Sequence, residues 1–292
     1  MTRAFTLMIS CTLFYSLTAF AKEAALEACD TAVQQQQFAQ AISLADNYPQ
    51  HVGFWLCKGR AQSALNKPAD AEASFQQALR LKPTGLDLIS AYLLLGNAQR
   101  DSQHFDAALQ SYQQALDNSE QQNMRRYARI AHNLIGETHA EAGQYDLALQ
   151  AFKVGEKLAM NDDERADSYV HVAQTYQQLQ QLDQAIEYQL KGVLMLRKSG
   201  TPDQYAEASL ALGQLFVAKQ DYVGADKTYQ RLFDYARENG GSFYEAKTAV
   251  YWAAAKRAKG DHSGAAQLLA QAQQLAAQLK DPELDALLTK GL

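Results

Sequence analysis

The sequence carries six histidines, the side chains best suited to bind a metal ion or to move a proton near neutral pH. His132 and His139 are seven residues apart, so a helix over this segment would place both on one face. No carboxylate stands beside them at the spacing of a metal-binding motif. We therefore interpret these histidines as part of the core or of a groove edge, and expect no metal site.

The acidic run Asp162-Asp163-Glu164 is the other group that could act as ligands or as an acid and a base. It lies where a helix is expected to begin, and the helix dipole stabilises carboxylates in a first turn. The sequence contains no serine nucleophile elbow, no glycine-rich phosphate loop and no HExxH motif. It therefore predicts a protein that is not an enzyme and that needs no cofactor.

The composition favours a helical protein with a large core. Hydrophobic residues make up 47% of the chain, there are only five prolines, and runs of alternating β-branched residues are missing. The formal net charge is -5, and Arg125, Arg126 and Arg129 form the only basic cluster. Such a small cluster is typical of a solvated face, so we expect no nucleic-acid partner.

Residues 1–21 have the pattern of an export signal. Arg3 supplies a positive start, residues 4–20 are mostly apolar, and Ala19-Phe20-Ala21 is a small-x-small cleavage site. We expect cleavage after Ala21, a mature chain that begins at Lys22 without stable membrane insertion, and a periplasmic or secreted location. Two alternatives stay open: an uncleaved signal that serves as a membrane anchor, and a lipoprotein acylated on a cysteine.

The most regular stretch, residues 89–116, predicts two short helices folded against each other. Residues of one helix face recur there at spacings of three and four, first at Tyr92, Leu95, Gly96 and Gln99 and then at Phe105, Ala108, Tyr112 and Ala115. The polar segment 101–103 between the two halves suits a tight turn. One such pair cannot bury its apolar face alone, so the sequence predicts stacked copies.

Copies of this stretch fill nearly the whole chain. A marker alanine on each second helix recurs at spacings of 30, 37, 40, 37, 40 and 40 residues, at Ala41, Ala71, Ala108, Ala148, Ala185, Ala225 and Ala265. Helix starts are expected at three capping boxes and one proline, namely Ser119 with Gln122, Asn161 with Glu164, Ser242 with Glu245, and Thr201-Pro202. No Gly/Ser/Pro-rich linker interrupts the repeats, so residues 22–292 are expected to form one continuous domain.

These residues resemble the tetratricopeptide repeat family, whose hairpin carries an aromatic residue and a Leu-Gly pair on its first helix and Ala, aromatic and Ala on its second. The clearest matches are Trp55, Gly59, Ala71, Phe75, Ala78 and Pro83 in one unit and Tyr92, Leu95, Gly96, Ala108, Tyr112 and Ala115 in the next. The resemblance implies an all-α, right-handed α-solenoid of about seven antiparallel helix pairs. Units near 40 residues imply first helices longer than is usual in the family, and Asp281-Pro282-Glu283 is expected to begin a C-terminal capping helix.

Two cysteines remain after removal of the expected signal, Cys29 and Cys57, each on the first helix of one of two adjacent units. In an oxidising compartment a disulfide between them is favoured. It would close a loop of about 28 residues and stabilise the end repeat, which has only one neighbour, by about 3 kcal/mol. The alternative is that both residues are buried thiols on helix faces.

In this family the first helices line a concave groove, so the informative residues are those that point away from the packed face. By the helical period they form two lines. The apolar line is Leu56, Leu93, Asn133, Val170, Leu210 and Val250. The polar line, four residues further along each helix, is Arg60, Asn97, Glu137, Gln174, Gln214 and Ala254, with Arg100 on the same open side. Such a surface suits an extended peptide or an amphipathic helix. The alternative is that the apolar line is additional core.

The sequence therefore predicts a non-catalytic, exported scaffold that binds a peptide or helix of a partner protein in its groove. Two alternatives stay open: a self-associating structural protein, and an accessory subunit of an envelope enzyme or of a secretion or assembly complex. The partner-binding hypothesis follows from the family resemblance and not from the chemistry of single residues.

Overall fold

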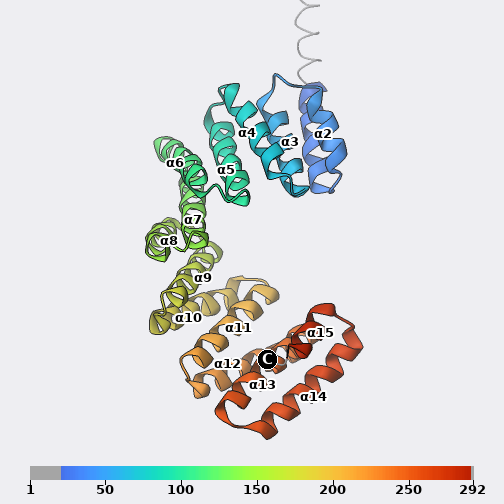
Figure 1. The fold of residues 1–292 in the computed structure, drawn as a ribbon, viewed down its shortest axis with the longest axis vertical. Coiled ribbons are helices and arrows are strands. Elements are labelled where there is room, and N and C mark those ends of the chain that lie inside the picture. Colours follow the sequence, from blue (N-terminus) through green and yellow to red (C-terminus); the bar gives the residue numbers. More distant parts are fainter. Residues whose placement is uncertain (1–20, 291–292) are drawn as a thin grey trace, which may run out of the picture. The chain divides into compact units, whose positions relative to one another are not determined.

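The computed structural model describes residues 21–290, and every regular element in this part of the chain is helical (Figure 1). The expected export signal lies outside the described residues except for Ala21. Residues 21–34 are helical and precede the labelled helices. These are α2 (Phe38–Asp46), α3 (Val52–Ala64), α4 (Pro68–Arg80), α5 (Gly85–Asp101), α6 (Phe105–Gln121), α7 (Arg125–Glu141), α8 (Tyr145–Leu158), α9 (Asp162–Gln178), α10 (Leu182–Ser199), α11 (Pro202–Ala218), α12 (Tyr222–Glu238), α13 (Ser242–Lys259), α14 (His262–Leu279) and α15 (Pro282–Thr289). The expected all-α solenoid of paired helices is confirmed.

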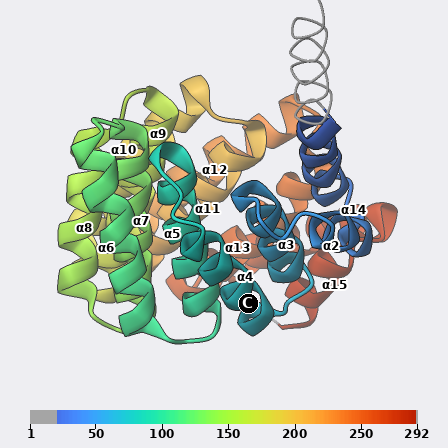
Figure 2. The ribbon, with the colours of Figure 1, turned by 90° about the horizontal axis from the view of Figure 1, so that it is seen from above.

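The chain divides into two compact units, residues 1–142 (unit 1) and residues 143–292 (unit 2). In unit 1 the helical residues 21–34 share a core with α2, and the pairs α3/α4 and α5/α6 follow one another, with α7 next to α6 (Figure 1, Figure 2). Unit 2 begins with α8 next to α9 and continues through the pairs α9/α10, α11/α12 and α13/α14. Odd-numbered helices from α3 to α13 are the first helices of their repeats. No helix in residues 21–290 is long and apolar enough to cross a bilayer.

The short helix α15 covers the last pair of unit 2, as the sequence predicts. Asp281 caps it, because one carboxylate oxygen accepts hydrogen bonds from the backbone N–H groups of Glu283 (2.9 Å) and Leu284 (3.2 Å). Leu284 is fully buried in a small core with Ala246 of α13 and Ala276 of α14. An array of repeats needs such a cap because its last pair has a neighbour on one side only.

Each repeat turns from its first to its second helix through one residue in the left-handed conformation. This residue comes five positions before every marker alanine, and φ is positive at Gln36, Asn66, Gln103, Gly143, Gln180, Gln220 and Gly260. The polar turn expected at 101–103 is confirmed: the N–H of Gln103 donates to the carbonyl of Arg100 (2.7 Å), and the N–H of His104 donates to that of Gln99 (2.8 Å). Because this turn has a constant length, each marker alanine occupies the same position in its second helix, although the spacing between successive marker alanines varies.

Close packing within a pair depends on a glycine of the first helix that faces a ring of the second. The pairs are Gly59 with Phe75, Gly96 with Tyr112, and Gly213 with Tyr229, each 16 residues apart. A Cβ atom added to any of these glycines would lie 2.3 or 2.4 Å from a ring carbon, far inside normal contact. Because cores are packed densely, any side chain here would push the two helices apart. The glycines and rings of the repeat pattern therefore set the distance between helices.

Two expected helix starts are confirmed together with their side-chain caps. The hydroxyl of Thr201 accepts from the N–H of Gln204 (3.2 Å), and the side chain of Gln204 accepts from the N–H of Thr201 (2.8 Å), around Pro202 as first residue. Asn161 accepts from the N–H of Glu164 (2.8 Å) at the start of α9. Both helices follow a short non-helical segment, so the free N–H groups of their first turn need a hydrogen-bond partner.

Of the other two expected starts, the one at Ser119 is wrong, whereas a helix does begin at Ser242 but without the expected capping box. Ser119 lies inside α6, where its hydroxyl donates to the carbonyl of Ala115 (2.7 Å) instead of capping a new helix. Ser242 is the first residue of α13, after Gly241, and makes no capping bond. A serine three residues before a glutamine or glutamate also occurs within helices, where the hydroxyl finds a carbonyl one turn back.

The extra length of the units is shared between the two helices of a pair. The pair α3/α4 has 13 residues in each helix, whereas α5 and α6 have 17 each and α13 and α14 have 18 each. The first helices after α3 are therefore longer, as expected, and the second helices of these pairs lengthen with them. Antiparallel partners lengthen together because unmatched turns would leave apolar side chains without cover.

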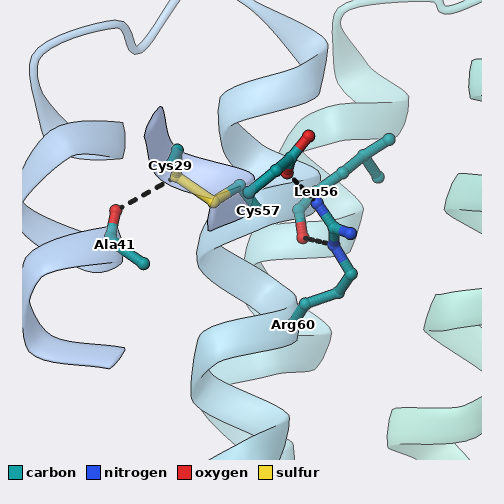
Figure 3. The surroundings of a disulfide bond; sticks show 6 residues. Cys29, Ala41, Leu56, Cys57 and Arg60 are labelled. Carbon is teal, nitrogen blue, oxygen red and sulfur yellow. Dashed lines mark hydrogen bonds and ion pairs between the residues drawn. A yellow bond between two sulfur atoms is a disulfide. The ribbon is translucent and has the colours of Figure 1, made fainter. Parts of the chain in front are cut away.

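Cys29 and Cys57 form the expected disulfide, with a Cα–Cα distance of 6.3 Å across 28 positions (Figure 3). Cys29 lies in the helical residues 21–34 and Cys57 in α3, and both are fully buried. The sulfur atom of Cys29 also lies 3.3 Å from the carbonyl oxygen of Ala41 in α2. The bond therefore joins the first helices of two neighbouring repeats at the N-terminal end of unit 1.

Candidate binding surface of the first helices

Most successive first helices within a unit contact one another along one side of that unit. In unit 1, α3 contacts α5 and α5 contacts α7, and in unit 2, α11 contacts α13. We call the surface that these helices present, on the side away from their second helices, the inner face of a unit. The two lines of residues taken from the sequence belong to the first helices, so their burial and contacts decide what the inner face offers.

The apolar line is mostly buried. The exposed fractions are 7% for Leu56, 8% for Leu93, 8% for Asn133, 3% for Leu210 and 1% for Val250, whereas Val170 is half-buried. Leu56 packs in one core cluster with Phe75 and Leu95, and Leu210 belongs to the main core of unit 2. These side chains stabilise the stack of helices, and Val170 is the member of the line with most surface left for a partner.

The polar line of unit 1 is engaged within the unit. Arg100 of α5 forms an ion pair with Glu137 of α7 and lies 3.7 Å from Glu141 on the same helix. Asn97 accepts a hydrogen bond from the hydroxyl of Tyr112 (2.7 Å). Burial raises the pKa of Tyr112, so this hydroxyl keeps its proton and remains a donor. These contacts join α5 to both of its neighbours.

Arg60 is engaged in the same way at the other end of unit 1. Its guanidinium pairs with Asp30 in the helical residues 21–34, and its Nε donates to the carbonyl of Leu56 (3.4 Å), which Figure 3 shows beside the disulfide. Arg60, Asn97, Arg100 and Glu137 therefore all bind other groups of unit 1. A partner would have to break these contacts to use them.

Unit 2 presents a pocket on its inner face instead. Gln174 and Gln214 are exposed, and beside Gln174 a pocket of about 370 Å³ lies between α9 and α11. Its apolar lining consists of Val170, Leu196, Ala208 and Ala211. Gln189 of α10 is 99% buried in this lining, and its amide donates to the carbonyl of Ala208 (2.9 Å), which holds α10 against α11. The pocket thus has a fixed apolar floor.

The rim of this pocket is acidic. Its exposed or half-exposed lining residues are Asp163, Asp167, Gln174, Gln204 and Glu207, and no lysine or arginine lines it. Asp167 lies 3.4 Å from Nε2 of His171, and Glu207 accepts a hydrogen bond from Lys247 (2.7 Å). The surface therefore combines an apolar floor with carboxylates and amides at the edge.

Lys247 of α13 links three helices next to this rim. Its ammonium lies 2.7 Å from Glu207 of α11 and 2.9 Å from Glu283 of α15, and its side chain is only 11% exposed. Burial by itself would lower the pKa of Lys247, but the hydrogen bonds to the two carboxylates raise it above the ordinary value. Lys247 therefore stays charged and ties the capping helix to the inner face.

Sequence reasoning misses the acidic rim. It assigns Asp163 to the first turn of a helix and leaves out Asp167 and Glu207. The signal is nevertheless present, because Asp167 and Glu207 come three residues before Val170 and Leu210, which places them on the same helix face. Which of these faces is open and which is covered depends on neighbouring helices and not on the period.

A larger pocket, of about 660 Å³, lies elsewhere on unit 2 over α12. Its charged lining residues are Arg197, Lys227, Arg231, Lys256, Asp226, Asp234 and Glu238. Asp226 accepts from the indole of Trp252 (2.8 Å) and from Lys259 (3.2 Å), so part of this charge is already neutralised. Because both signs of charge line it, this pocket favours no single class of ligand.

The histidines have structural surroundings. Burial lowers the pKa of His132, and burial together with Lys22 lowers that of His51, so both are neutral near pH 7. The ring of His171 stacks on Phe152 with 4.8 Å between centroids. Within residues 21–290 no three His, Cys, Asp or Glu side chains are grouped so as to hold a metal ion.

Comparison with known proteins gives matches along most of the chain. Profiles described as tetratricopeptide repeat match residues 23–85, 93–163 and 166–195, which together are more than half of the chain. Outer dynein arm-docking complex subunit 4 of Homo sapiens is 24% identical over 187 residues, and that of Xenopus laevis is 26% identical over 148 residues. These alignments cover 62% and 51% of this chain but 27% and 28% of the relatives. The chain therefore spans about a quarter of their length.

Several solved structures share the fold at low sequence identity. The apo form of RapI has a TM-score of 0.72 at 13% identity, covering 91% of this chain and 79% of RapI. A signal transduction ATPase with a tetratricopeptide repeat sensor, from Pyrococcus horikoshii, has a TM-score of 0.72 at 18% identity, covering 92% of this chain and 44% of that protein. At such identities the likeness describes the fold alone.

Proposed function

This chain belongs to the tetratricopeptide repeat family and is a protein–protein interaction scaffold, and we propose that it binds a segment of its partner on the inner face of unit 2. Repeats of this family are typically non-catalytic. The proposed site consists of the pocket between α9 and α11 together with the exposed amides Gln174 and Gln214 beside it.

The observation that supports this site is the open pocket on unit 2. An apolar floor of fixed shape inside a polar rim is the usual arrangement for a groove that receives a helix or an extended peptide. The floor here is rigid, because the buried amide of Gln189 holds α10 against α11 through Ala208. On unit 1 the corresponding polar side chains already bind one another, as in the ion pair of Arg100 with Glu137.

We also propose that the protein is exported to an oxidising compartment such as a bacterial periplasm. The export pattern of residues 1–21 and the disulfide of Cys29 with Cys57 support this location, because disulfides persist where the surroundings are oxidising. Mass spectrometry of the protein isolated from its own cells tests it. We expect an N-terminus at Lys22 and no thiol that reacts with an alkylating agent. An N-terminus at Met1, with reactive thiols at Cys29 and Cys57, would contradict the proposal.

Site-specific photocrosslinking in the native cell tests the binding site. A benzophenone amino acid replaces Gln174 at the rim of the pocket, and in a matched chain it replaces Gln184, an exposed glutamine on the second helix α10 of the same unit. We expect a protein adduct from position 174 and none from position 184, followed by identification of the adduct by mass spectrometry.

Both positions are exposed glutamines. A difference in adduct yield between them therefore reports which face the partner contacts, and not how reactive the crosslinker is. Equal adducts from both positions, or an adduct from position 184 alone, would exclude the inner face of unit 2 as the binding site. Helical content measured by circular dichroism confirms that both chains are folded.

A further inference from the structure

We infer that the pocket between α9 and α11 receives the side chain of a tyrosine from the partner. The ring would enter at the register where other repeats of this chain bury a ring of their own. The inference rests on the proposed function and specifies which side chain of the partner enters the pocket.

Repeats in both units bury a ring of their second helix four residues after the marker alanine. These rings are between 0% and 2% exposed, and they are Phe75, Tyr112, Phe152 and Tyr229. In the pair α9/α10 the same register, four residues after Ala185, holds Gln189. Gln189 is just as deeply buried and lines the pocket. The pocket therefore opens where this repeat has an amide instead of a ring.

The first helix of the next repeat also has a smaller side chain here. Ala211 of α11 lines the pocket and stands 14 residues before the marker alanine Ala225. The same register holds Leu134 in α7 and Tyr251 in α13. An amide in place of a ring, and a methyl group in place of a larger side chain, leave space between α9 and α11. This shortage of side-chain volume explains the pocket of about 370 Å³.

The rings that the pair α9/α10 does contain pack elsewhere. Tyr188 contacts Tyr169 and Tyr176, with 5.9 and 5.6 Å between ring centroids, and the ammonium of Lys191 lies 4.5 Å from the centroid of Tyr188. No aromatic side chain of residues 21–290 lines the pocket. The described chain therefore does not fill this space with a ring of its own.

The floor of the pocket carries a hydrogen-bond acceptor that has no partner in the described chain. The amide nitrogen of Gln189 donates to the carbonyl of Ala208 (2.9 Å), which identifies the other amide atom, Oε1, as the acceptor. Within residues 21–290 this oxygen accepts no hydrogen bond. A buried acceptor left in this state costs free energy. The floor therefore favours an entering group that can donate a hydrogen bond.

Tyrosine combines the two properties that the pocket selects. Its ring can pack against the apolar lining, where Val170 and Leu196 remove it from water, and its hydroxyl at the tip can donate to Gln189. Leucine or phenylalanine would leave the acceptor without a partner. Lysine would bring a charge onto an apolar floor, which is costly. A buried aromatic side chain is also the usual anchor of a segment in a groove.

Two small molecules test this chemistry without knowledge of the partner. One is 4-methylphenol, which has the ring and hydroxyl of a tyrosine side chain, and the other is toluene, which lacks the hydroxyl. Both are titrated into the full chain with isotope-labelled methyl groups. The methyl signals of Val170 and Leu196 in nuclear magnetic resonance spectra then report entry into the pocket.

We expect 4-methylphenol to shift these methyl signals and to bind at least about threefold more tightly than toluene, because its hydroxyl donates to Oε1 of Gln189. Toluene is the more apolar molecule, so a pocket without a free acceptor would prefer it. Unshifted signals, or binding of toluene as tight as that of 4-methylphenol, would overturn the inference.

A matched pair of variants tests whether the pocket is the place of binding. Ala211→Leu fills the pocket with the residue that α7 has at this register, and Ala254→Leu makes the same change at a half-buried alanine of α13 outside the pocket. Ala211→Leu should weaken 4-methylphenol at least about tenfold, while Ala254→Leu stays within about twofold. Equal weakening in both variants would overturn the inference. Circular dichroism confirms that both chains are folded.

The photocrosslink at position 174 separates this inference from the proposed function. If the adduct maps to a partner segment with a tyrosine, and is lost in Ala211→Leu but kept in Ala254→Leu, both are supported. If it is unchanged in Ala211→Leu, or its segment contains no tyrosine, the binding site stands and the tyrosine is wrong. If no adduct forms in the unaltered chain, the proposed site fails, and the inference fails with it.

Discussion

The inner faces of unit 1 and unit 2 use their polar side chains in opposite ways. On unit 1, Arg100 and Asn97 are bound to Glu137 and Tyr112 of neighbouring helices. On unit 2, the side chain at the register of Asn97 is the exposed Gln174, beside an open pocket. Polar residues at equal positions of a repeat thus hold helices together in one unit and face solvent in the other.

The cores of the two units, in contrast, are built alike. Gly96 faces Tyr112 in unit 1 as Gly213 faces Tyr229 in unit 2, at nearly the same distance. The repeat pattern therefore fixes how helices pack, while the inner face is free to differ from repeat to repeat. What distinguishes this scaffold from others of its fold lies in the side chains that the pattern does not specify.

The largest expected effect comes from the disulfide of unit 1. Replacement of Cys29 and Cys57 by alanine should lower the free energy of unfolding of unit 1 by about 3 kcal/mol, because the 28-residue loop then regains its freedom in the unfolded chain. Native-state hydrogen exchange read by mass spectrometry would locate the loss. Helices α2 and α3 should lose protection while α11 to α14 keep theirs; equal losses in both units would show that they unfold together.

The second effect tests the common core. Gly96→Ala and Gly213→Ala should each destabilise the protein by about 1–3 kcal/mol, since the new methyl group would meet the ring of Tyr112 or Tyr229. Urea unfolding of the two variants gives the comparison. In a double-mutant cycle, Tyr112→Leu should recover part of the stability that Gly96→Ala loses. A loss of stability from only one of the two glycine variants would contradict the equivalence of the cores.

The third effect tests the difference between the inner faces. Arg100→Ala leaves the half-buried Glu137 without its partner and should cost about 1–2 kcal/mol of stability. Gln174→Ala should cost less than about 0.5 kcal/mol, because its exposed amide can be replaced by water at little expense. Thermal unfolding measures both. Similar losses from the two variants would mean that the face of unit 2 is as tightly bound as that of unit 1.

The smallest effect is a pH dependence of unit 1. Folding lowers the pKa of His51 and of His132, so the unfolded chain takes up protons first as the pH falls. Stability is then complete above the ordinary histidine pKa of about 6.5 and declines as the pH falls from there toward the folded values. Hydrogen exchange at pH 7.5 and at pH 5.5 should show the decline in α7, and His132→Gln should reduce it. A decline of the same size in that variant would assign the effect to other groups.

Much of the fold follows from local pattern. The marker alanines keep their phase because each stands five residues after a left-handed turn residue, and the capping box of Thr201 with Gln204 is visible in the sequence. The prediction of a helix start at Ser119 is wrong for a physical reason. A serine hydroxyl can cap a helix start or donate to a carbonyl within a helix, and the sequence around Ser119 is compatible with either.

Less of the candidate site could be predicted. The helical period shows which side chains share a face, but Leu56 and Leu210 are covered by helices from other repeats, which the period does not reveal. The pairing of Arg100 with Glu137 joins residues 37 positions apart, and such contacts depend on how repeats stack. Asp167 and Glu207 share a helix face with Val170 and Leu210, but only the fold shows that they lie at the rim of a pocket.

The disulfide also determines how a mechanical load would travel through unit 1. A pull on the N-terminus reaches Cys29 and passes through the two sulfur atoms to Cys57, so α2 and the turns around it carry no tension. The residues between the cysteines therefore cannot extend when the protein is stretched. At about 3.5 Å per residue, the disulfide withholds roughly 100 Å of contour length. A force-extension trace in the presence of a reducing agent would show that length as one additional step.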